Sequence, residues 1–134
     1  MIDPESKEII TFRLKESTES LSDASILFRN GSYRSSINRA YYAMFYSVTA
    51  LLVNKGISTS KHSGAIACFD KEYVMTKIFG KELSKSLHRA FELRQESDYA
   101  ELNDAEEEDA SLLLQDATEF VNQIKNYIEE SIFK

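Results

Sequence analysis

The sequence is poor in the residues that form tight turns. Of its 134 residues, one is proline and four are glycine. Sheets joined by hairpins use both residues in their turns, so this scarcity argues against a β-rich fold and favours long helices. The one proline, Pro4, lies where the first turn of a helix tolerates it.

Cysteine is also scarce. Cys68 is the only cysteine, so an intramolecular disulfide is excluded and a reducing compartment is expected. Its neighbours are alanine, isoleucine and phenylalanine, which favours a core residue over a nucleophile.

Long apolar runs and targeting signals are missing as well. No apolar stretch approaches the length of a membrane span. The first ten residues lack the basic and apolar regions of a signal peptide. We therefore expect a cytoplasmic protein without a membrane partner.

Sequence patterns for metal and cofactor sites are equally absent. There is no glycine-rich phosphate loop, no Cys/His cluster with metal-ligand spacing and no Ser-His-Asp pattern. The sequence therefore predicts neither a metal site nor a cofactor.

The apolar residues, in contrast, are plentiful and recur at helical spacing. They make up 43% of the chain, enough for one domain over 1–134 with one core. Asn30-Gly31 and Lys55-Gly56 predict helix ends, Ser32 a helix start, and Asp104 with Glu107 a capping box. The fold expected is all-α, an antiparallel up-and-down bundle of four long helices and one short helix. The predicted helices span 4–29, 33–54, 64–74, 81–99 and 104–133.

Charge is distributed unevenly along the chain. The net charge is −6, yet residues 29–94 hold eleven basic and four acidic side chains. Residues 96–109 hold eight acidic and no basic side chains. A basic middle segment is compatible with a polyanion such as RNA, but charged solvent faces of long helices give the same pattern.

The helix predicted over 33–54 is apolar on two opposite faces when its residues are placed at about 100° each. The first face predicts the bundle core and comprises Ile37, Tyr41, Met44, Val48, Leu51 and Leu52. The second face comprises Ser35, Arg39, Tyr42, Ala43, Tyr46, Ala50 and Val53. Two apolar faces require two packing partners, so we expect a two-fold homodimer through the second face; the alternative is a helix fully enclosed in its own bundle.

Arg39 stands out on this second face. A buried or interfacial guanidinium needs an anionic or hydrogen-bonding partner. Across a two-fold axis, two copies of Arg39 would repel each other unless an anion bridged them, so Arg39 is a candidate phosphate ligand. The alternative is a salt bridge to Asp98 or Glu96.

Three segments resemble one known family. Residues 38–46 read NRAYYAMFY after Gly31-Ser32-Tyr33, residues 61–64 read KHSG, and residues 94–99 read RQESDY. These segments resemble the HEPN domain (higher eukaryotes and prokaryotes nucleotide-binding), in particular small stand-alone prokaryotic members. The resemblance covers roughly residues 21–127, and the first segment is the most specific.

The resemblance implies a dimeric helical bundle that pairs with a small nucleotidyltransferase, often as toxin and antitoxin. Many members of the family are metal-independent ribonucleases. Their motif is an Arg that holds the scissile phosphate, followed four to six residues later by a His that assists attack by the ribose 2′-hydroxyl. Two such sites meet at the dimer interface.

This sequence departs from that motif because no His follows Arg39 within 33–54. Tyr46 lies on the same helix face as Arg39. The resemblance matches it to the tyrosine to which, in some related toxins, the partner attaches a nucleotide. As a base Tyr46 would be poor, because a phenol has a pKa near 10. His62 is a candidate substitute base that could approach from the following loop, and its alternative role is to fix that loop. His88 is expected at the surface.

The candidate catalytic residues are therefore Arg39, Tyr46 and His62. Candidate ligand-binding residues are Asn38, Tyr42, Arg94, Asp98 and Tyr99. Three functions are compatible with this set. The first is a toxin-like ribonuclease of a toxin–antitoxin pair; the second is a non-catalytic dimer that binds a nucleotide or the nucleotidyltransferase. The third is a structural dimer in which Asp98 neutralises Arg39.

Overall fold

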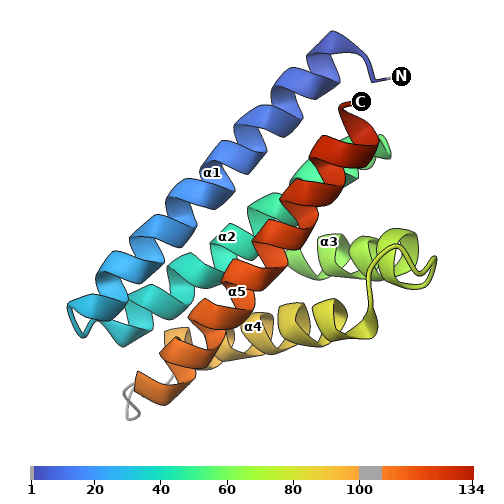
Figure 1. The fold of residues 1–134 in the computed structure, drawn as a ribbon. Helices are drawn as coiled ribbons and strands as arrows, with labels where there is room; N and C mark the ends of the chain where they lie inside the picture. The colour runs from blue at the N-terminus through green and yellow to red at the C-terminus, as the bar shows by residue number, and fades with distance from the viewer. Residues whose placement is uncertain (1, 100–106) are drawn as a thin grey trace.

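A computed structural model describes residues 2–99 and 107–134, and within these residues every regular element is a helix and there is no strand (Figure 1). Helix α1 runs from the upper right to the lower left, α2 and α5 run back in the opposite direction, and α4 crosses from right to left (Figure 1). The all-α, up-and-down bundle is thereby confirmed. Its elements are α1 (Pro4–Arg29), α2 (Tyr33–Asn54), α3 (His62–Phe69), a π turn η1 (Asp70–Val74), α4 (Lys81–Tyr99), α5 (Glu107–Tyr127) and a second π turn η2 (Ile128–Ile132).

The bounds of α1 and α4 agree with those predicted, and α1 has identifiable end signals. The Asp3 carboxylate accepts a hydrogen bond from the Ser6 backbone N–H at 2.8 Å, and Pro4 occupies the first turn. After α1, Gly31 adopts a φ of 77°, a conformation that glycine tolerates best. Ser32 occupies the N-cap position of α2, but its side chain makes no capping hydrogen bond, unlike the prediction.

Two other predicted ends need correction. Helix α3 begins at His62 rather than residue 64, because Lys61 is extended at the N-cap and its carbonyl accepts from Ala65 N–H at 3.0 Å. The last helix becomes a π turn after Tyr127 instead of continuing as a regular helix to 133. Asp104, predicted to start that helix, lies outside the described residues.

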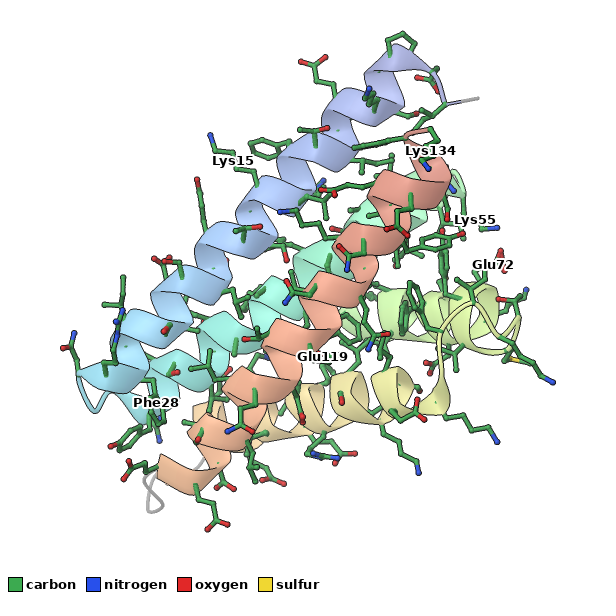
Figure 2. The ribbon with its side chains drawn as sticks, in the orientation of Figure 1. Lys15, Phe28, Lys55, Glu72, Glu119 and Lys134 are labelled. Atoms are coloured by element: carbon green, nitrogen blue, oxygen red, sulfur yellow. The ribbon has the colours of Figure 1, made fainter. Side chains whose placement is uncertain are left out.

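Helix α2 is the central element, since it packs against α1, α3, α4 and α5. The predicted core face is confirmed, because Ile37, Tyr41, Met44 and Val48 are 0% exposed. Among the described residues, no helix is both long and apolar enough to cross a bilayer. Charged side chains such as Lys15 and Lys134 lie on the outside of the bundle (Figure 2).

The second face of α2 divides into two parts. Ala43 is buried beneath α1, where Ser17 Oγ donates to its carbonyl at 2.6 Å. Ser36, next to this face, is buried as well, and its Oγ donates to the Ala24 carbonyl at 2.8 Å. Small residues here allow the two helices to approach within the chain. Arg39, Tyr42 and Tyr46 remain half-buried. Val53 is also half-buried and Ser35 is exposed, so the predicted homodimer depends on these five side chains and stays a prediction.

Candidate functional site

The candidate site is built on aromatic side chains of α2. Tyr41, Tyr42 and Phe45 follow one another closely along the helix, and Tyr46 lies beside Tyr42 with ring centroids 5.9 Å apart. The Tyr41 and Tyr42 rings meet edge to face at 5.3 Å. These rings form a platform that receives one residue from α3 and another from α4.

His62 is the residue that α3 contributes, at the first position of that helix. Its imidazole stacks on the Phe45 ring with centroids 4.0 Å apart and planes 6° apart. Its Nδ1 lies 2.6 Å from the Tyr41 hydroxyl. His62 is therefore fixed against α2 by a stack and a hydrogen bond and is not a freely moving loop residue.

Arg94 is the residue that α4 contributes. Its guanidinium carbon lies 4.9 Å from the Tyr41 ring centroid, and its NH1 donates to the Tyr42 hydroxyl at 3.1 Å. The Arg94 Nε is buried and has no hydrogen-bond partner among the described residues. A guanidinium held mainly by ring faces keeps its positive charge unpaired and available to an anion.

Arg39 also contacts Tyr42, with its guanidinium carbon 4.9 Å from the Tyr42 ring centroid. Its Nε and NH2 donate to the Asn38 side-chain oxygen at 3.1 and 3.0 Å. Asn38, Arg39 and Asp98 line one shallow depression of about 450 Å³. Among the described ion pairs, none joins Arg39 to Asp98 or Glu96, so the alternative salt bridge does not form.

Burial determines the protonation of the two groups that share the short hydrogen bond. Burial, and then the nearby Arg94 charge, lower the pKa of His62. Burial raises the pKa of the Tyr41 hydroxyl well above its ordinary value. At neutral pH the pair is therefore an uncharged imidazole and a protonated phenol.

The structure brings together most of the predicted site residues through Tyr42. Arg39 and Arg94 each lie against its ring, His62 meets it edge to face at 5.6 Å, and Tyr46 flanks it. The side chain of Tyr99 lies outside the described residues. Metal binding finds no support in the described part of the chain, where no three His, Cys, Asp or Glu side chains gather.

Two site residues were missed from the sequence, Tyr41 and Phe45. Helical spacing placed Tyr41 in the core, which is correct for its ring but says nothing of its hydroxyl. A buried tyrosine hydroxyl nearly always has a polar partner, and this rule indicates that a buried Tyr41 needs a hydrogen-bonding residue beside it. His88, in contrast, is exposed as expected and lies 2.7 Å from an oxygen of Asp70.

Comparison with known proteins matches residues 10–127 to the HEPN domain. The chain belongs to the HEPN family. The matched region contains every residue of the aromatic platform together with Arg39, His62 and Arg94. The family resemblance read from the three sequence segments is thus confirmed.

Relatives of this HEPN chain extend over nearly its whole length. A protein named "UPF0332 protein" from Thermotoga maritima is 43% identical, covering 94% of this chain and 96% of the relative. Two proteins of Methanocaldococcus jannaschii are named as toxins. "Putative toxin MJ0605" is 35% identical over 97% of this chain and 96% of its own length, and "Putative toxin MJ0142" is 34% identical over 90% and 83%.

Proposed function

We propose that this HEPN protein is the toxin-like member of a toxin–antitoxin pair and acts on RNA as a metal-independent ribonuclease. The observation that carries the proposal is the gathering of Arg39, Arg94 and an uncharged His62 around Tyr42, where neither arginine pairs with a carboxylate among the described residues. Hydrogen-bond donors and fixed positive charge are what a scissile phosphate requires. The names of the two archaeal relatives agree with a toxin.

The roles of the residues follow from their positions. Arg39 binds the scissile phosphate from the depression that Asn38 and Asp98 also line. His62 supplies the imidazole that α2 itself lacks after Arg39. A two-fold homodimer through the exposed part of α2 brings two such sites together in the cytoplasm. The partner is a small nucleotidyltransferase, with Tyr46 as the hydroxyl that it modifies.

An RNA-cleavage assay without added metal tests this proposal. We compare the purified protein with Arg39→Ala and with a matched control, Arg89→Ala, which removes an exposed arginine on α4 that pairs with Asp116 at 3.1 Å. Loss of a group that stabilises transition-state charge typically costs about a hundredfold or more in rate. We expect that loss for Arg39→Ala and none for Arg89→Ala. Equal cleavage by all three proteins would contradict the proposal, as would no cleavage by any.

A non-catalytic dimer that binds a nucleotide or the nucleotidyltransferase is the second candidate. It is favoured by the engagement of His62 Nδ1 with Tyr41, which leaves one ring nitrogen for chemistry. It predicts that the protein binds RNA or nucleotide without cleaving it and that Arg39→Ala abolishes binding. The structural dimer is not supported, because Asp98 does not pair with Arg39.

A further inference from the structure

His62 is surrounded by groups that determine where its single proton resides. Tyr41, Tyr42 and Phe45 of α2 face the imidazole ring. The positive charge of Arg94 on α4 lowers the pKa of His62. The described ion pairs place no carboxylate at this imidazole. Its hydrogen-bonding partner among the described residues is the Tyr41 hydroxyl, at Nδ1.

The direction of this hydrogen bond follows from the burial of Tyr41. The residue is 0% exposed, so its hydroxyl proton cannot be given to bulk water and needs an acceptor inside the protein. Nδ1 of His62, 2.6 Å away, is the acceptor that the described residues provide. A neutral imidazole has one acceptor and one donor nitrogen, so acceptance at Nδ1 leaves the proton on Nε2.

We propose that Tyr41 is a positioning residue that holds His62 as a neutral imidazole with its proton on Nε2, from which it donates a hydrogen bond to an anionic phosphate oxygen bound at Arg39. This inference rests on the proposed function and sharpens it. With the proton on Nε2, His62 is a hydrogen-bond donor at neutral pH and not a general base. Other enzymes likewise use a neutral histidine to polarise an oxygen.

Nitrogen NMR of the histidine rings tests the first half of the proposal directly. The chain contains two histidines, so ¹⁵N-labelled protein gives two ring spin systems, and the exposed His88 serves as an internal reference. We expect Nδ1 of neutral His62 to resonate as an acceptor nitrogen and Nε2 as a protonated one. A proton on Nδ1, or an even mixture of the two forms, would overturn the proposal without any variant having to fold.

Tyr41→Phe then tests the role of the hydroxyl. A donated hydrogen bond stabilises neutral His62, so its removal raises the His62 titration midpoint by a few tenths to about one pH unit. If Nδ1 were instead the donor, the bond would stabilise the charged form and the midpoint would fall. Tyr73→Phe is the matched control, because Tyr73 is equally buried but donates to the Leu51 carbonyl at 2.9 Å. A fall, or no shift, in Tyr41→Phe contradicts the proposal.

A single-stranded oligoribonucleotide with 2′-O-methyl groups tests the second half, since it presents phosphates but cannot be cut by its own 2′-oxygen. Saturating probe should shift the His62 Nε2–H resonance and leave His88 unchanged. An unmoved Nε2–H would show that His62 does not donate to the phosphate. If the probe moves Nε2–H but native RNA is never cleaved, the ribonuclease proposal fails while the donor role of His62 holds.

Discussion

The two histidines of the chain occupy opposite chemical environments. His62 lies half-buried against Phe45 and Tyr41, with Arg94 nearby and no carboxylate partner among the described residues. His88 lies exposed on α4, with Nε2 2.7 Å from Asp70. The imidazole of His62 is thus kept uncharged, whereas the imidazole of His88 lies next to a carboxylate. The difference is that His62 lies near the positive charge of Arg94, whereas His88 lies beside the carboxylate of Asp70.

The largest expected effect is on stability, because the surroundings of His62 are tightly packed and those of His88 are exposed. Tyr41→Ala removes a fully buried ring that contacts His62, Phe45 and Phe91, and it should lower the free energy of unfolding by about 3–5 kcal/mol. Chemical denaturation measures this change. His88→Ala, analysed in parallel, should change stability by less than about 1 kcal/mol. Similar losses in both variants would remove the contrast between the two regions.

A smaller effect isolates the Tyr41 hydroxyl from its ring. Tyr41→Phe and Tyr73→Phe each delete a single buried hydrogen bond, to His62 and to the Leu51 carbonyl. Each should cost about 1 kcal/mol in the free energy of unfolding. If both variants lose the same stability but only Tyr41→Phe shifts the titration midpoint of His62, then the Tyr41 hydroxyl positions His62 and does not act through general destabilisation. A Tyr41→Phe variant as stable as wild type would mean that the short hydrogen bond contributes little.

The pH dependence of stability gives a third test. The folded-state pKa of His62 lies below the ordinary value of 6.5, so below pH 6.5 the unfolded chain binds a proton that the folded chain does not. The contribution of His62 to stability therefore falls as the pH drops below 6.5 towards the folded-state pKa. His62→Gln should flatten this part of a curve of unfolding free energy against pH, and His88→Gln should leave it in place. The reverse result would exchange the roles of the two histidines.

The smallest expected effect concerns the counter-ion of His88. Asp70 also accepts from Ser84 Oγ at 2.7 Å, and the side chain of His88 is 49% exposed. Asp70→Asn should change stability by less than about 1 kcal/mol, because water replaces a largely exposed hydrogen bond at little cost. RNA cleavage and the His62 spectrum should both be unaffected. Loss of cleavage in this variant would move the functional site towards η1.

The sequence by itself determined most of the helices and pointed to the candidate residue Arg39. Few turn residues, strict apolar spacing and the Asn30-Gly31 and Lys55-Gly56 breaks were enough for α1, α4 and the core face of α2, because these features act within a few residues. Arg39 was found on the same basis, as a charged side chain on an otherwise apolar helix face.

Only the tertiary structure decided what completes that site. The hydroxyl of Tyr41 meets His62, and Arg94 meets Tyr42 across 52 positions of sequence. Ala43 belongs to the face through which a dimer is predicted, yet α1 packs on it and Ser17 of α1 donates to its carbonyl. Helical periodicity tells which side of a helix is apolar but not which element covers it, since that depends on how separate helices cross.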